Sequence, residues 1–193
     1  MSGKFTLTPT AIPAVLVIET KKFGDHRGFF SETYSREALR AGGFDLEFVQ
    51  DNHSLSGQAG TLRGLHFQAA PFAQDKLVRC AHGRILDVAV DIRSGSPTYG
   101  RHVAVELSGA NWRQLLVPKG FAHGFLTLEP DCEVLYKVTN PYSAAHDFGL
   151  AFDDPALAIT WPWPADSLVL SDKDRRQPTL AGLGEYFAYA PPQ

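Results

Sequence analysis

The stretch Leu86-Asp87-Val88-Ala89-Val90-Asp91-Ile92 decides the fold of this chain. Its four bulky apolar residues alternate with two aspartates and an alanine, and this period of two is typical of a β-strand whose side chains point alternately to opposite faces. Stretches 103–107 and 132–138 repeat the pattern. Three alternating stretches of this kind predict a sheet rather than helices.

Turn signals separate the stretches at short intervals. They read His82-Gly83, Ser94-Gly95-Ser96-Pro97, Ser108-Gly109-Ala110-Asn111, Pro118-Lys119-Gly120, Glu129-Pro130-Asp131 and Asn140-Pro141. Glycine, proline, asparagine and aspartate favour tight turns for separate stereochemical reasons. Short strands at this spacing are typical of β-sandwiches and barrels. We therefore expect an all-β fold.

The N-terminal part contains the one convincing helix. Ser35 is a suitable N-cap, residues 36–41 form the predicted body, and Gly42-Gly43 is a stop signal. We predict strands at 15–18, before the helix, and at 44–52, after it.

Length and composition indicate one domain with an ordinary core. The chain has 193 residues, 44% of them hydrophobic and 20% charged. We see no linker, and expect a single domain over 1–193 with its core at about 14–150 and an extension at 151–193. The net charge of −3 argues against nucleic-acid binding. Two cysteines are too few for a disulfide framework.

The N-terminal residues carry no apolar run of the signal-peptide type. The longest early apolar run, 14–18, is far shorter than a membrane span. We expect a soluble, cytoplasmic protein that does not enter a membrane.

The candidate chemistry begins at Arg63-Gly64-Leu65-His66-Phe67-Gln68, followed closely by Lys76. In an extended chain Leu65, Phe67 and Arg63 share one face, and Gly64, His66 and Gln68 the other. A base beside two fixed cations suits proton removal and stabilisation of the resulting anion. A single histidine on a strand is, however, more often a hydrogen-bonded structural residue.

A catalytic metal is not expected. A metal-binding jelly-roll barrel uses two histidines one residue apart, a glutamate and a later histidine. Here Gln68 stands where the second histidine would be, and His123 alone cannot make a site.

Tyr136 is a candidate proton donor. It shares a strand face with Val134 and Val138, so its hydroxyl points into the barrel or the core, where a phenol needs a partner. Such a hydroxyl can protonate a carbanion from the face opposite a base.

The remaining motifs lead to a family. They are Asp25-His26-Arg27-Gly28-Phe29-Phe30 with Glu32, Gln50-Asp51-Asn52, Gln74-Asp75-Lys76-Leu77-Val78, 83–91, 118–125, Tyr136-Lys137 and Ser171-Asp172-Lys173-Asp174. With the hexapeptide at 63–68, these motifs make the chain from about Phe23 to Leu180 similar to the dTDP-4-dehydrorhamnose 3,5-epimerases. These are nucleotide-sugar epimerases of the cupin superfamily.

The resemblance implies a cupin-like jelly-roll β-barrel with short peripheral helices, built as a strand-swapped homodimer. The implied reaction inverts C3 and C5 of a dTDP-linked 4-keto-6-deoxyhexose without a cofactor. His66 is implied as the general base, Asp172 as its orienting partner, Lys76 as the enolate stabiliser and Tyr136 as the opposing acid. The implied substrate-binding residues are Arg27, Phe29, Glu32, Gln50, Asn52, Arg63, His123, Asp147 and Lys173.

Two alternatives stay open. Many relatives carry Glu and Trp where this chain has Asp147 and Phe152, so it could instead be a 3-epimerase or a ketoisomerase of a related deoxysugar. The alternative from another class is a non-catalytic nucleotide-sugar-binding barrel, which would bind ligand without exchanging sugar protons. The co-occurrence of a base, a cation and an acid argues against mere binding.

Overall fold

The computed structural model describes residues 4–191 as a β-rich structure with short helices. The sequence predicts no signal-peptide run at the N-terminus, and residues 1–3 of that segment lie outside the described residues. The strands are β1 (Phe5–Pro9), β2 (Leu16–Thr20), β3 (Lys22–Asp25), β4 (Gly28–Ser31), β5 (Gln50–Ser56), β6 (Leu62–Gln68), β7 (Lys76–His82), β8 (Arg84–Asp91), β9 (Arg93–Ser94), β10 (His102–Ser108), β11 (Arg113–Val117), β12 (Phe121–Thr127), β13 (Cys132–Val138), β14 (Asp147–Gly149) and β15 (Phe187–Ala188). The helices are α1 (Arg36–Ala41) and the 3-10 turns Ala144–His146, Pro155–Leu157, Ala165–Ser167, Asp174–Arg176 and Leu180–Gly182.

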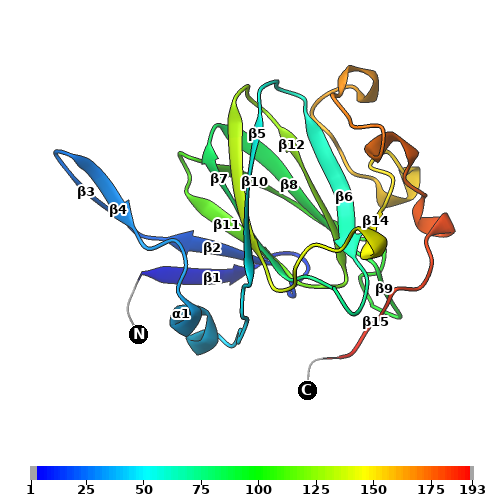
Figure 1. The fold of residues 1–193 in the computed structure, drawn as a ribbon, viewed down its shortest axis with the longest axis horizontal. Helices are drawn as coiled ribbons and strands as arrows, with labels where there is room; N and C mark the ends of the chain where they lie inside the picture. Colours follow the sequence, from blue (N-terminus) through cyan, green and yellow to red (C-terminus); the bar gives the residue numbers. More distant parts are fainter. Residues whose placement is uncertain (1–3, 192–193) are drawn as a thin grey trace.

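Two antiparallel sheets face each other and form the barrel (Figure 1). One has six strands in the order β1-β2-β11-β7-β13-β5, and the other has five in the order β10-β8-β12-β6-β14. Neighbouring strands that are far apart in sequence, such as β11 beside β2, are typical of a jelly roll. The expected all-β jelly-roll barrel is confirmed.

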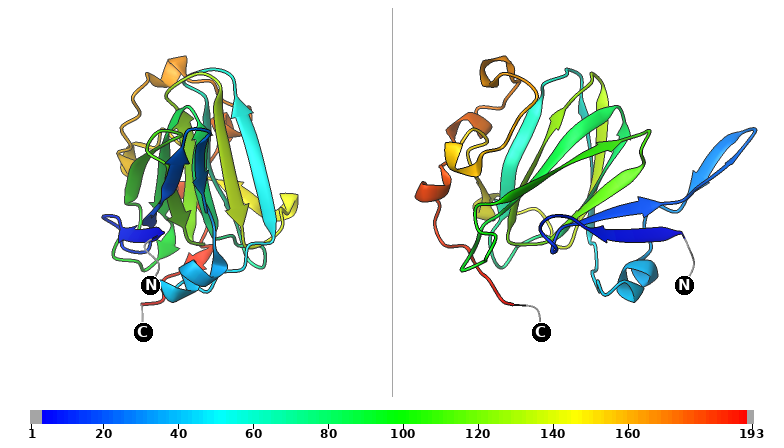
Figure 2. Two further views of the ribbon diagram at one scale, coloured as in Figure 1. Left: turned by 90° about the vertical axis from the view of Figure 1, so that its left-hand side faces the viewer. Right: turned by 180° about the vertical axis from the view of Figure 1, so that it is seen from behind.

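The alternating stretch lies largely in strand β8, and its regular pattern reflects the different surroundings of the two faces of this strand. Val88 and Val90, on one face, pack in a cluster with Leu150 and Leu157 from the chain after β14. Asp87 and Ala89 face the other way, toward the barrel interior, and are fully buried. The apolar face is therefore covered by the C-terminal extension, which runs along the outside of the five-stranded sheet (Figures 1 and 2).

The predicted helix is confirmed, and the strand predicted after it is partly wrong. The Ser35 side chain caps α1 by accepting from the Ala38 N–H. Strand β5 begins only at Gln50. The preceding residues alternate in exposure because Phe44, Leu46 and Phe48 pack beside α1 against the six-stranded sheet. Such packing produces a strand-like pattern without membership of the sheet.

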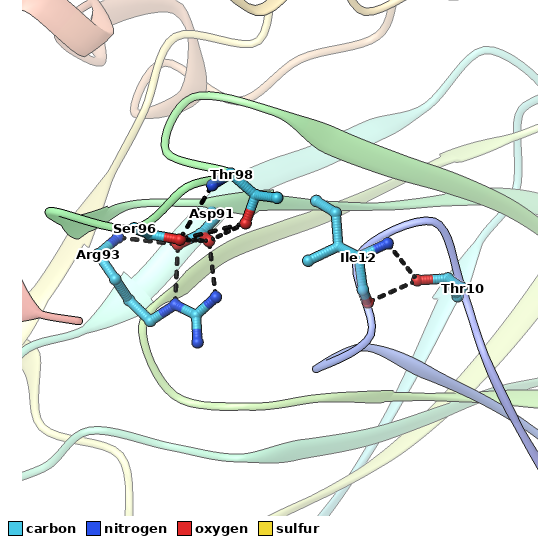
Figure 3. Close-up of polar contacts among 6 residues, drawn as sticks. All are labelled: Thr10, Ile12, Asp91, Arg93, Ser96 and Thr98. Carbon is cyan, nitrogen blue, oxygen red and sulfur yellow. Dashed lines mark hydrogen bonds and ion pairs between the residues drawn. The ribbon is translucent and has the colours of Figure 1, made fainter. Parts of the chain in front are cut away.

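A buried carboxylate fixes the turn after β8. Asp91 accepts hydrogen bonds from the Arg93 guanidinium and from the hydroxyls of Ser96 and Thr98 (Figure 3). The same guanidinium lies over the ring of Tyr189, 5.1 Å from its centroid, and β15 pairs with β9. The end of the described chain is thereby attached to the barrel.

The β3–β4 hairpin projects away from the barrel (Figures 1 and 2). Phe23 and Phe30 are paired across it and are 42% and 69% exposed. A two-stranded hairpin with exposed phenylalanines is marginal in water on its own.

Among residues 4–191, no helix is both long enough and apolar enough to cross a membrane.

Candidate active site

The five-stranded sheet contributes polar side chains to the barrel interior. Register partners lie on the same face of a sheet, and His66 pairs with His123 on β12 and with Gly149 on β14. Gln68 pairs with Asp147 on the same edge. His66, His123 and Asp147 are therefore carried on the inner face by three adjacent strands.

The six-stranded sheet contributes the facing set. Lys76 pairs with Val138, and Tyr136 pairs with both Val78 and Asn52. Gln50 lies one inward position further along β5, where its amide donates to the Asn52 Oδ1 at 2.8 Å. These polar groups share the inner face with Val78, which belongs to the barrel core.

Apolar side chains fill much of the barrel interior, including Ile85, Leu107, Leu115 and Cys132. The polar groups described above are carried on the inner faces of β5, β6, β7, β12, β13 and β14. We call this part of the interior the polar end. A small β-barrel lined in part by polar side chains can hold one ligand there.

The orienting partner of His66 is Asp174, and the assignment of Asp172 is wrong. The His66 Nε2 lies 2.5 Å from an Asp174 carboxylate oxygen, and the Asp174 side chain is 3% exposed. Asp172 is exposed, and its backbone carbonyl accepts from Arg176. The Ser171 hydroxyl accepts from the Asp174 N–H, which turns the chain so that the later aspartate faces inward.

The electrostatics keep Asp174 ionised. Burial raises the pKa of Asp174, but hydrogen bonds and charge from His66, with bonds from Ser171 and the Gly64 backbone, bring it below its ordinary value. A carboxylate at one imidazole nitrogen holds the proton there, so the other nitrogen carries the lone pair. His66 can therefore accept a proton from a ligand in the barrel.

Lys76 is a buried cation. Its Nζ donates to the His66 carbonyl oxygen at 3.3 Å, from the opposite sheet. Burial, with a smaller contribution from the charge of Lys173, lowers the pKa of Lys76 to about 8, and the attraction of Asp147 and Asp87 opposes this shift. An ammonium group in a site of low polarity stabilises a nearby oxyanion strongly.

Tyr136 faces His66 across the barrel, because its strand belongs to the other sheet. Burial raises the pKa of Tyr136, Arg63 opposes this and Asp147 adds to it, so the phenol stays protonated at neutral pH. A base and a protonated phenol on facing sheets can act on opposite sides of one carbon.

Arg63 lies toward the barrel edge rather than beside Leu65 and Phe67. Its guanidinium donates to the Ser56 hydroxyl at 3.1 Å and to the Leu55 carbonyl, both on β5. The β6–β12 register shifts between His123 and Phe125, so Arg63 does not follow simple alternation. The backbones of β6 and β12 lie close together at Gly64. Only glycine fits at this position, since a Cβ there would lie 2.5 Å from the Gly124 Cα.

Three side chains meet near the polar end. Asp147 accepts from Lys173 at 2.5 Å and from the Tyr142 hydroxyl at 3.0 Å. Lys173 therefore joins the extension to β14. Phe152 lies elsewhere, buried against Leu62 on the outer face of β6. Asp147 and Phe152 are the two positions that depart from the family pattern. Of these, only Asp147 lies beside the candidate site.

His123 has its own buried partner. Its Nε2 lies 2.9 Å from Asp87 Oδ1, and both side chains are at least nine-tenths buried. The ring is thereby fixed in orientation on the strand next to that of His66.

The hairpin residues are not brought to His66 within one chain. Arg27 is bound to Asp25 at the hairpin tip, and Glu32 forms an ion pair with Lys4 at 3.0 Å. The Phe29 ring lies edge-on to Trp112, 5.0 Å between centroids.

Sequence reasoning missed three residues of the site: Asp174, Tyr142 and Asp87. The signal for Asp174 is its position three residues after Ser171, a spacing that favours a side-chain-capped turn. Asp87 lies on the polar face of the alternating stretch. Tyr142 follows a proline in a loop and offers no comparable signal.

Within residues 4–191, no group of three or more His, Cys, Asp or Glu side chains is arranged to hold a metal ion.

The fold and these contacts define a jelly-roll barrel equipped for acid–base chemistry. Residues 9–182 match the family model described as dTDP-4-dehydrorhamnose 3,5-epimerase. The chain belongs to that family, and it is an epimerase.

Individual comparisons agree. The dTDP-4-dehydrorhamnose 3,5-epimerase of Sinorhizobium fredii is 56% identical over 179 residues, 93% of this chain and 91% of the relative. The crystal structure of a dTDP-6-deoxy-D-glucose-3,5-epimerase from Legionella pneumophila, in complex with dTDP-4-keto-L-rhamnose, is 42% identical with a TM-score of 0.92, covering 97% of this chain and 100% of that one. A 3'-monoepimerase from Streptomyces bikiniensis, in complex with dTDP-quinovose, is 34% identical with a TM-score of 0.83, covering 91% and 88%.

Proposed function

We propose that the protein converts dTDP-4-dehydro-6-deoxy-D-glucose to dTDP-4-dehydro-L-rhamnose by inverting C3 and C5. The observation that supports this most is the placement of a His66–Asp174 pair and a protonated Tyr136 on facing sheets, with the Lys76 ammonium bonded to the His66 carbonyl oxygen. Inversion needs a base on one face of a carbon and an acid on the other, and the two sheets supply them.

The reaction begins with removal of a proton next to the ketone. His66 takes the C–H proton, and its electron pair moves to make the enolate C=C bond while the carbonyl becomes an oxyanion. Lys76 stabilises that oxyanion by charge and hydrogen bonding. Tyr136 then donates its proton to the opposite face, restoring the ketone with inverted configuration. Proton exchange with water returns both side chains to their starting states, so no redox cofactor is needed.

The diphosphate is placed by cations at the polar end. Arg63 offers a planar guanidinium, suited to bidentate contact with phosphate oxygens, and Lys173 a point charge. Gln50, Asn52, His123 and Asp147 supply hydrogen bonds for the sugar and nucleotide. The substrate competes with Asp147 for Lys173, since one ammonium group faces both.

The hairpin is proposed to complete the site of a second subunit in a homodimer. Arg27, Phe29 and Glu32 lie on or beside the projecting β3–β4 hairpin, away from their own barrel (Figure 2). Phe29 would then lie against the base of the partner's nucleotide. We place this dimer in the cytoplasm, where nucleotide sugars are made and used.

The dimer can be tested at the exposed phenylalanine pair. We expect wild-type protein to sediment as a dimer and Phe30→Asp to shift it toward monomer, because a buried charge at an apolar contact is costly. Tyr99→Asp, at a residue that is 41% exposed on a turn after β9, is the matched control. A monomeric wild-type protein, or a fully dimeric Phe30→Asp variant, would refute the role of the hairpin.

Tyr136→Phe tests the function and the mechanism together. Proton NMR of the product mixture should show dTDP-4-keto-L-rhamnose from the wild-type protein. The variant keeps the base but lacks the acid, so we expect inversion to slow about 100-fold while deuterium exchange from solvent D2O persists. Tyr34→Phe, at a ring that packs with Phe48 outside the barrel, should behave as wild type.

Two other outcomes of the NMR experiment would support the alternative functions. Inversion at C3 alone by the wild-type protein would make it a 3-epimerase and direct attention to Asp147. Ligand binding without any product would support the non-catalytic barrel.

A further inference from the structure

Asp154 is a buried carboxylate that the proposed reaction does not use. It is 8% exposed and lies in the chain that follows β14. Its Oδ1 accepts from the Ala156 N–H at 2.9 Å, which caps the 3-10 helix Pro155–Leu157. Its Oδ2 accepts from the Leu180 N–H at 2.6 Å, across 26 positions of sequence. The first bond is local, but the second ties two distant segments together.

The tied segment carries Asp174. Between Asp174 and Leu180 the chain follows the outside of the five-stranded sheet, and its Pro178 carbonyl accepts from the Ala151 N–H at 2.8 Å. The Gln177 side chain covers Gly149, where any Cβ would overlap it. The Leu180 side chain packs against the cluster that contains Leu65 and Phe67 on β6.

The segment that leads from β14 to Asp154 begins next to His66 in the sheet. Gly149 pairs with His66, and the Leu150 N–H donates to the Leu65 carbonyl at 2.9 Å. The chain then runs through Ala151 to Asp154. Residues 149–154 therefore lie against the strand of His66, and residues 174–180 carry Asp174. The bond from the Leu180 N–H to Asp154 connects these two segments.

Backbone ladders do not fasten this part of the extension. Residues 171–182 contain two 3-10 turns and no paired strand, so a few contacts set their position. Hydrogen bonds to an ionised carboxylate are roughly twice as strong as neutral ones. Losing a hydrogen-bond partner inside a protein leaves an N–H group unsatisfied, which destabilises that arrangement.

We propose that Asp154 is a positioning residue for the His66–Asp174 pair, acting through the Leu180 N–H. This inference rests on the proposed function, since it concerns the general base of that reaction. A displacement of about 1 Å at a catalytic group can cost on the order of 100-fold in rate. Asp154 thereby affects turnover from outside the barrel without touching the substrate.

Asp154→Asn is the direct test. The amide has the shape of the carboxylate but only one acceptor oxygen, so it cannot serve both N–H groups. We expect kcat for dTDP-4-keto-6-deoxyglucose to fall about tenfold, with KM and dTDP affinity unchanged. Asp166→Asn makes the same change at an exposed residue of the extension and should leave both constants as in wild type.

A double-mutant cycle separates positioning from general damage. If Asp154 acts through Asp174, adding Asp154→Asn to an Asp174→Asn protein should lower kcat no further. An equal further loss in that background, or an unchanged kcat in the single variant, would overturn the proposal. If Asp174→Asn itself kept full activity, the proposed base pair would be the part that fails.

Loss of folding does not end the test. Asp154→Glu keeps both acceptor oxygens and moves them by one methylene. If Asp154→Asn does not fold, this variant should fold with kcat lowered and KM retained, and wild-type kcat from it would overturn the proposal.

Discussion

Replacement of His66 by Asn is expected to lower kcat by about 1000-fold or more, because the substrate loses its only proposed base. The smaller amide should leave the barrel intact, since the His66 side chain is 30% exposed and is not part of the apolar core. Steady-state turnover of dTDP-4-keto-6-deoxyglucose measures the effect, and thermal unfolding and dTDP binding establish that the variant is folded.

The matched control is His53→Asn. His53 is a histidine on a strand too, but it lies on the outer face of β5, bonded to Glu133 at 2.9 Å. It should turn over as wild type. Near-normal activity in folded His66→Asn protein would assign proton removal to another group.

Lys76→Met is the second large effect, and it acts in opposite directions on activity and stability. Loss of the ammonium group should lower kcat by about 100-fold or more, because the enolate oxygen loses its cation. The same change removes a buried charge that desolvation disfavours. Allowing for the lost bond to the His66 carbonyl, we expect the free energy of unfolding at pH 7 to rise by on the order of 2 kcal/mol.

The pH dependence follows from the pKa of Lys76, lowered to about 8 by burial from the ordinary value of 10.5. Above pH 8 the folded protein loses this proton while the unfolded chain keeps it until about pH 10.5. The unfolded state then binds more protons, so the contribution of Lys76 to stability rises with pH across this window. Activity should fall across the same window as the oxyanion loses its cation.

Comparison of two variants isolates this contribution. The stability difference between wild type and Lys76→Met, from urea unfolding, should shrink as pH rises from 8 to 10. Lys119→Met, at an exposed loop lysine, should show no such trend. A constant difference, with activity level through pH 10, would show that Lys76 is neither desolvated nor needed as a cation.

The sequence predicts the inward-facing residues of regular strands better than the residues beside irregularities in the sheet. Tyr136 could be placed on an inner face because alternation along a strand is enforced by backbone geometry. Arg63 departs from that rule, since a register shift on the neighbouring strand lies between it and His66. Alternation alone carries no information on such an irregularity.

The partner of His66 could not be chosen from the sequence for a different reason. Asp172 and Asp174 lie in one charge-rich run, and either can reach a neighbouring strand. Which one turns inward depends on the 3-10 turn capped by Ser171, and on packing further along at Leu180. Both are tertiary effects on a segment without sheet pairing.

The boundary errors have a similar cause. Residues 44–49 resemble a strand because Phe44, Leu46 and Phe48 bury alternate side chains, yet ladder pairing begins only at Gln50. A pattern reports burial, whereas strand membership also requires a neighbour with free backbone groups.

Deuterium incorporation into dTDP-4-keto-6-deoxyglucose in D2O tests the central claim most directly. The wild-type protein should replace the protons at both C3 and C5, seen as loss of both signals by proton NMR, and His66→Asn should replace neither. Exchange at both carbons by the folded His66→Asn protein would contradict the account, as would a folded, dTDP-binding wild-type protein that exchanges neither.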